Sequence, residues 1–106
     1  MKVWIKLIKH FQGGSKEDYM FVNESDIATE NDKETLMEYW GENSDGGHAY
    51  GYRVEMHRLE ENEYPPLEWI EKKLLSNEGD IDHLKLKINA IHELNIELLR
   101  TKLKYL

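Results

Sequence analysis

Cysteine is absent from the 106-residue chain, and proline occurs only twice, as the pair Pro65-Pro66. The lack of thiols excludes disulfide scaffolds, cysteine-based zinc sites and thiol catalysis, and it fits a reducing compartment. No apolar run reaches the roughly 18 residues of a membrane span. The first eleven residues contain several hydrophobic side chains, but Lys6, Lys9 and His10 interrupt them, so this segment lacks the apolar core of a signal peptide. We therefore expect a cytoplasmic protein that has no membrane contact.

Basic residues are scarce in one part of the chain. The net charge is −7, from 14 basic and 21 acidic residues. Residues 17–45 hold ten acids and a single base, Lys33, whereas residues 1–16 hold four Lys and no acid. An acidic block repels phosphate backbones and favours basic partners, so we expect a protein partner and no direct nucleic-acid binding.

Three segments have the patterns of β-strands. Residues 2–11 alternate between an apolar face and a mixed face, and 19–22 form a second short apolar run. The glycine-rich segment 12–15 between them predicts a hairpin turn. Residues 48–59 alternate most clearly of all, which predicts a third strand.

Helices are predicted on either side of the third strand. The first has an apolar face over 36–40, with Asn31 or Asp32 as its N-cap and Gly41 as its end. After Pro65-Pro66, an apolar face over 67–74 predicts a second helix that stops at Gly79. A third helix, capped by Asp80 or Asp82, is expected to run for about 24 residues, or roughly 36 Å.

These elements predict an α+β fold. A small antiparallel sheet in the order strand–strand–helix–strand is followed by a C-terminal helical hairpin with one long helix. The length fits a single domain, residues 1–106, in which 1–64 form the sheet with its helix and 65–106 form the hairpin.

The acidic block supplies the first candidate site. Carboxylates interspersed with aromatic side chains can anchor on a basic protein surface, although such a run is also typical of a solvated, solubilising face. The candidate partner-binding residues are Glu30, Asp32, Glu34, Glu38, Tyr39, Trp40, Glu42 and Asp45.

The expected long helix supplies the second candidate site. Its apolar positions step by three and four residues, which is the heptad pattern of a coiled coil, with Asn95 at a polar a position. This seam predicts either a homodimer or an intramolecular helix pair with a wet position at Asn95. Leu94 and Leu99 widen the stripe beyond a strict seam, which suits packing on the chain's own sheet as well. The candidate dimerisation residues are Leu84, Ile88, Ile91, Asn95 and Leu98.

Chemistry-bearing motifs are few. The five histidines form no metal-binding spacing, the glycine segments lack the context of a phosphate loop, and no serine lies in a nucleophile elbow. We expect no enzyme activity, no catalytic residues, no metal and no cofactor. A small enzyme or metal protein that uses His48, His57 or His83 is the weaker alternative.

The acidic block Glu17–Asp45 and the heptad helix Ile81–Tyr105 give the chain a general resemblance to small accessory proteins of bacteriophages and mobile elements. Some of those proteins inhibit host defence nucleases, including the anti-CRISPR class, by presenting acidic surfaces to nucleic-acid grooves. The resemblance implies an inhibitor that acts in the host cytoplasm. It assigns no role to any single residue.

Together these features predict a non-catalytic, acidic protein-binding module. It would dock on the basic nucleic-acid-binding surface of a host defence protein such as a CRISPR nuclease. The alternative function is a structural or assembly protein that forms a homodimer through the C-terminal heptad helix. Both can hold at once, because a dimer would present two acidic faces.

Overall fold

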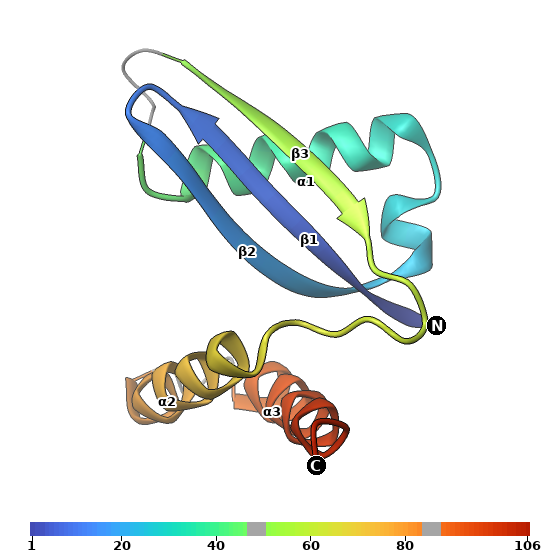
Figure 1. The fold of residues 1–106 in the computed structure, drawn as a ribbon, viewed down its shortest axis with the longest axis vertical. Helices are drawn as coiled ribbons and strands as arrows, with labels where there is room; N and C mark the ends of the chain where they lie inside the picture. The colour runs from blue at the N-terminus through green and yellow to red at the C-terminus, as the bar shows by residue number, and fades with distance from the viewer. Residues whose placement is uncertain (47–50, 84–87) are drawn as a thin grey trace. The chain divides into compact units, whose positions relative to one another are not determined.

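The computed structural model describes residues 1–46, 51–83 and 88–106, and leaves out the side chains of 78–83 and 88–91. The chain consists of two compact units, Met1–Glu63 and Tyr64–Leu106 (Figure 1). The first unit holds an antiparallel sheet and a helix, and the second holds a helical hairpin. The predicted α+β class is confirmed, and the division lies one residue from the expected boundary between 64 and 65.

The sheet has three strands in the order β2-β1-β3, and both pairings are antiparallel. The predicted hairpin is confirmed: Phe11 pairs with Gly14, so Gln12 and Gly13 form a two-residue connection. Gly13 has φ +101°, a conformation that favours glycine. The second strand is longer than the expected 19–22. The strand bounds are β1 Lys2–Phe11, β2 Gly14–Asn23 and β3 Tyr52–Arg58.

The helices differ from the prediction at their ends. A short 3-10 helix, which no sequence pattern predicted, precedes α1 and buries Ile27. The N-cap of α1 is Thr29, and not Asn31 or Asp32: its hydroxyl accepts from the Asp32 N–H at 3.0 Å, while the Asp32 carboxylate accepts from the Thr29 N–H at 3.2 Å. This reciprocal pair is a capping box. The helix bounds are η1 Glu24–Ile27, α1 Glu30–Asn43, α2 Leu67–His83 and α3 Ile88–Leu103.

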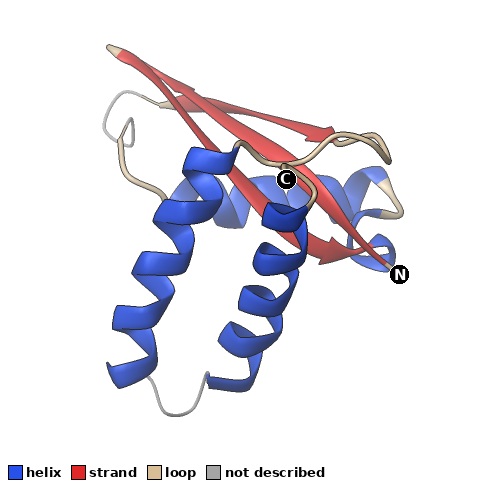
Figure 2. Ribbon diagram, turned by 60° about the horizontal axis from the view of Figure 1, so that its bottom comes forward, coloured by secondary structure: helices blue, strands red, loops and turns tan. Residues whose placement is uncertain are grey.

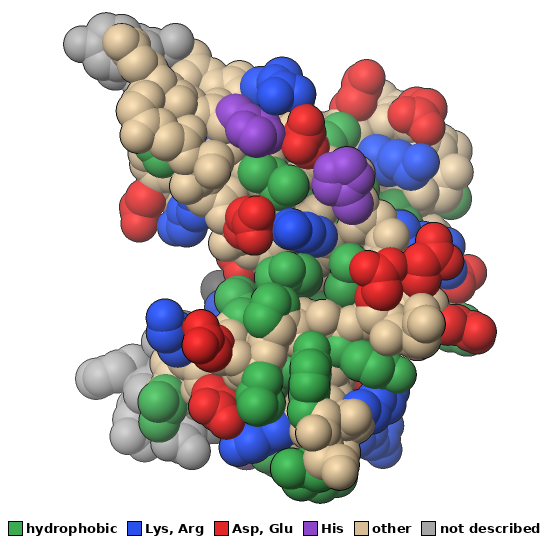
Figure 3. Space-filling view, in the orientation of Figure 1, with side chains coloured by type: hydrophobic (Ala, Val, Ile, Leu, Met, Phe, Trp, Pro, Cys, Tyr) green, Lys and Arg blue, Asp and Glu red, His purple; other side chains and the backbone are tan. Residues whose placement is uncertain are grey.

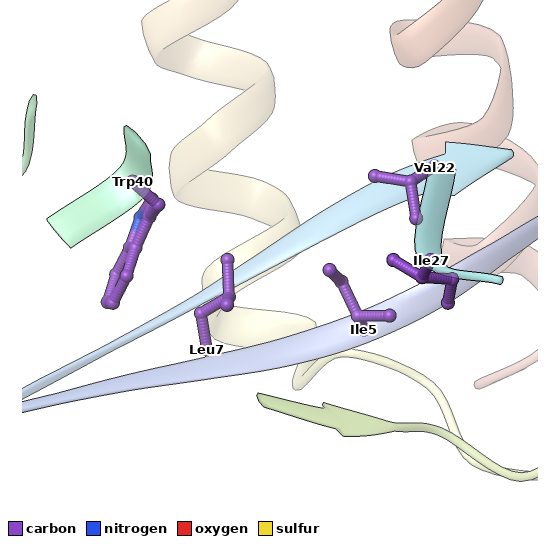
Figure 4. Close-up of a cluster of buried hydrophobic side chains, with 5 residues drawn as sticks. All are labelled: Ile5, Leu7, Val22, Ile27 and Trp40. Carbon is purple, nitrogen blue, oxygen red and sulfur yellow. The ribbon is translucent and has the colours of Figure 1, made fainter. Parts of the chain in front are cut away.

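The core of the first unit lies between α1 and one face of the sheet (Figures 1 and 2). The apolar side chains of β1 at alternate positions point to this face, as the period of two predicts. Figure 4 shows that β1, β2, η1 and α1 all contribute to the core. The buried cluster consists of Ile5, Leu7, Val22, Ile27 and Trp40.

A lysine shares this buried face of β1. The Lys9 side chain is fully buried, and its ammonium donates to the carbonyls of Gly41 at 2.8 Å and Ser44 at 3.0 Å. The same Nζ lies 4.5 Å from the centre of the Tyr52 ring. The last turn of α1 contains no basic residue. Lys9 therefore supplies, from the sheet, the cation that a helix C-terminus favours.

Gly41 does not end α1, which continues to Asn43. The glycine is needed for a different reason. A Cβ atom at this position would lie 2.5 Å from Cε2 of Tyr52, which is closer than atoms pack. The missing side chain thus allows the aromatic ring of β3 to contact the helix backbone.

The second unit is an antiparallel hairpin of α2 and α3, which lie side by side in Figure 2. Three predictions were wrong here. Gly79 does not stop α2, and Asp80 and Asp82 lie inside that helix rather than capping the next one. The expected helix of about 24 residues is replaced by α3, which has 16. Among the described residues, no helix is long and apolar enough to cross a membrane.

We expect Lys9→Met to destabilise the protein by about 1–3 kcal/mol, because buried carbonyl acceptors lose a charged donor. Urea unfolding at pH 7 measures this change. The matched control is Lys6→Met on the same strand, which removes only a partly exposed ion pair with Glu17 at 3.6 Å. That loss is expected to cost no more than about 1 kcal/mol. Equal stability of the two variants would contradict the role of Lys9.

Gly41→Ala is expected to destabilise the protein, although glycine to alanine inside a helix ordinarily stabilises it by about 1 kcal/mol. The reason is the overlap of the new Cβ with the Tyr52 ring. Thermal unfolding of Gly41→Ala, alone and combined with Tyr52→Ala, tests this cause. In the Tyr52→Ala background the alanine should no longer be harmful. A Gly41→Ala variant as stable as the parent would refute the close approach.

Candidate partner-binding surface

Four carboxylates follow one another along α1 at intervals of four residues. They are all exposed, and the buried Trp40 belongs to the other side of the helix. Residues four apart on an α-helix occupy the same face. We call this surface the acidic face of α1; its residues are Glu30, Glu34, Glu38 and Glu42.

The acidic face opposes the stability of its own helix. Each pair of like charges four residues apart costs about 0.2–0.5 kcal/mol, and the face contains three such pairs. Glu38 and Glu42 also lie toward the C-terminal end, where the helix dipole disfavours negative charge. Within the described part of the chain, Lys33 pairs only with Glu30, at 3.2 Å. Folding alone therefore gives no reason for the charges of Glu34 and Glu38.

The structure gives the predicted acids different roles. Asp32 belongs to the capping box, and Asp45 lies 3.7 Å from Lys16. Glu42 accepts a hydrogen bond of 2.8 Å from the Tyr52 hydroxyl, and this bond raises the pKa of Tyr52. Glu34 and Glu38 make no hydrogen bond or ion pair with any residue that the structure describes. These two carboxylates are the ones available to a partner.

The two predicted aromatic anchors lie on different sides of α1. Tyr39 is 67% exposed and extends into solvent beside the acidic face, as a partner-binding residue requires. Trp40 is only 8% exposed and packs in the core with Ile5 and Leu7, so its assignment to the binding surface was wrong. Their different fates follow from the helical period, since adjacent residues lie about 100° apart around the axis.

Where it is described, the predicted heptad seam faces α2 of the same chain or the segment just before α2. Asn95 accepts a hydrogen bond of 2.8 Å from Asn77, and Lys102 lies 3.7 Å from Glu71. The Tyr105 hydroxyl donates to the Pro65 carbonyl at 2.6 Å.

The dimerisation residues of this seam have two fates. Leu98 is fully buried, so Asn95 and Leu98 serve the intramolecular pair and not a dimer. Leu84 and the side chains of Ile88 and Ile91 lie outside the described residues.

The face of the sheet opposite α1 carries a second cluster of charged groups. Strand register places Glu55 among three basic side chains, and Figure 3 shows histidine, acidic and basic side chains together over the sheet. Oxygen atoms of Glu55 lie 3.1 Å from His10 Nε2, 2.9 Å from Arg53 Nη1 and 3.7 Å from His57 Nε2. The contact with His10 and then the hydrogen bond from Arg53 are the main causes that lower the pKa of Glu55.

This cluster is a poor candidate for catalysis. A general base acts best with a pKa near the working pH, whereas the pKa of Glu55 is moved further below it. No group of three His, Asp or Glu side chains in the described ranges could hold a metal ion. His48 and the side chain of His83 fall outside those ranges. The sequence prediction missed the contact between His10 and Glu55, because it depends on the register between β1 and β3.

Comparisons of the chain with protein-family models, with curated proteins and with solved structures give no match. Residue roles therefore come from the geometry of this chain alone. On that basis the acidic face of α1, together with Tyr39, is the candidate site.

The lowered pKa of Glu55 gives a pH-dependent prediction. Because this pKa is lower in the folded protein, ionised Glu55 stabilises the fold at pH values above its ordinary pKa of 4.5. That contribution is lost as the pH falls through the lower, folded-state value. Urea unfolding of the parent and Glu55→Gln should therefore differ at pH 7 and converge toward pH 3. A difference that stays constant over this range would contradict the interpretation.

Proposed function

We propose that this protein is a non-catalytic protein-binding module that acts in the cytoplasm of a host cell. The acidic face of α1 docks on the basic, nucleic-acid-binding surface of a host defence protein such as a CRISPR nuclease. The observation that carries the proposal is the exposed row of four carboxylates at four-residue spacing, which the helix bears at a cost to its own stability.

The spacing of the row suits a surface that holds nucleic acid. Its four carboxylates span about 18 Å, one every ~6 Å along the helix. A nucleic-acid strand carries a phosphate for every ~3.4 Å of helix axis, so the row has roughly half that charge density. Neighbouring carboxylates lie within the ~8 Å screening length at physiological salt, and therefore act together on a partner. Such a field speeds encounter with a basic groove and disfavours acidic partners.

The helix that bears the row is held at both ends. The capping box of Thr29 and Asp32 fixes its first turn, and the Lys9 ammonium binds the carbonyls of its last turn. A rigid surface loses little conformational entropy on binding. Exposed Tyr39 adds an aromatic side chain of the kind that dominates the energetics of protein interfaces.

The test is a competition assay with purified CRISPR nucleases loaded with guide RNA. Fluorescence anisotropy of a labelled target duplex reports how strongly the protein displaces DNA from the nuclease, at 50 and 200 mM salt. We expect Glu34→Lys with Glu38→Lys to raise the concentration needed for displacement at least tenfold. We also expect displacement by the unmodified protein to weaken at the higher salt.

The matched control is Glu60→Lys with Glu61→Lys, which makes the same change in net charge at exposed positions between β3 and α2. Glu42 is left unchanged, because it bonds to Tyr52. Equal weakening by both double variants would mean that only overall charge matters, and would overturn the assignment to α1. Absence of displacement from every nuclease in the panel would overturn the proposed class of partner.

A further inference from the structure

The outer side of α3 carries an apolar stripe. Ile96 and Leu99 are each 51% exposed, and Leu103 is 64% exposed. Their steps of three and four residues keep them on one face of the helix. The buried residues Leu98 and Thr101 lie on a different side. Helices of monomeric proteins rarely leave such a row in water, so the stripe indicates an interaction surface.

The stripe differs from the heptad seam that pairs α3 with α2. That seam uses Asn95 and Lys102, which contact Asn77 and Glu71 of the same hairpin. One edge of the apolar stripe is therefore already occupied by α2, and only the other edge can meet a partner.

The available edge carries one acid and one base, seven residues apart. Both Glu93 and Arg100 are exposed, and the Arg100 side chain is 71% exposed. Its contact with Glu97 in the same helix is 4.0 Å, at the outer limit of an ion pair. The guanidinium can therefore turn toward a stronger partner. A spacing of seven residues, about two helical turns, places both groups along the same side of the stripe.

We propose that this stripe binds a second copy of the same chain, with the two α3 helices antiparallel. A two-fold axis near Ile96 and Leu99 packs Ile96 of each copy against Leu99 of the other. The same axis places Glu93 of each copy opposite Arg100 of the other, which gives two symmetric ion pairs. A two-fold interface uses the same patch on both subunits, and here that patch complements itself in charge. This inference is independent of the proposed role of α1.

Parallel pairing does not use this complementarity. It would set the edge with Glu93 and Arg100 of each copy against the edge with Asn95 and Lys102 of the other, and those two residues already contact α2. The antiparallel arrangement instead brings two hairpins together as four helices, an architecture whose core consists of such apolar stripes.

Sedimentation equilibrium of the full-length protein at 5–500 μM tests the contact. We expect a concentration-dependent dimer, and Leu99→Glu should raise its dissociation constant at least tenfold. The matched control is Leu75→Glu on α2, since Leu75 is 69% exposed and does not belong to the stripe. Circular dichroism of both variants verifies that the helices form. The proposal is overturned if the protein is monomeric at every concentration, or if both changes raise the dissociation constant of the dimer equally.

A charge exchange tests the antiparallel orientation. Glu93→Lys alone and Arg100→Glu alone each create like-charge contacts across the dimer, so each should raise the dissociation constant. The double variant restores both pairs with their signs exchanged and should recover the original value at 50 mM salt. Failure of the double variant to recover it, with both single variants weakened, overturns the antiparallel arrangement.

Discussion

The buried ammonium of Lys9 is the contact on which the sheet unit depends. A charged amine removed from water is costly unless its N–H groups find acceptors. Here the carbonyls of Gly41 and Ser44 provide them, and the Tyr52 ring lies against the same nitrogen. One side chain thus joins the central strand, the end of α1 and the third strand. It also replaces the basic residues that the last turn of α1 lacks.

This arrangement explains how α1 can carry so much negative charge on its outer face. The carboxylates repel one another and oppose the helix dipole toward the C-terminus. The Lys9 cation offsets part of this unfavourable electrostatic energy. It does so from inside the fold, so it does not neutralise the solvent-facing side of α1. The core packing of Trp40 and the capping box at Thr29 hold the rest of the helix. The same contacts that stabilise the unit therefore leave the acidic face free for a partner.

The apolar periodicity of the sequence predicts the strands and helices of this fold better than capping and stop residues predict where they end. Alternation in β1 and β3 identified both strands and their faces, because one face of the sheet is buried. The buried Lys9 was not predictable in this way, since a charged residue in an alternating pattern normally faces water. Gly41 and Gly79 are ordinary stop signals, yet α1 and α2 continue past them, and at Gly41 the Tyr52 ring occupies the space that a side chain would need. The sequence prediction included all four glutamates of the acidic face. It missed the burial of Trp40, because that depends on which side of α1 faces the sheet.

The heptad pattern agrees with the paired side of α3 at Asn95 and Leu98, although Ile81 lies in α2, and it does not reveal which helix is the partner. A seam with one polar residue suits a second chain as well as a neighbouring helix, and the Asn77–Asn95 bond shows that α2 occupies it. Once that side is used, the leucines and isoleucine next to it lie outside the hairpin, where self-complementary charges flank them. One apolar side of α3 thus packs against α2 of the same chain, and the other is exposed to a second copy. Pairing through the second side would give each assembly two acidic faces, and two-site attachment strengthens binding without any new contact on α1.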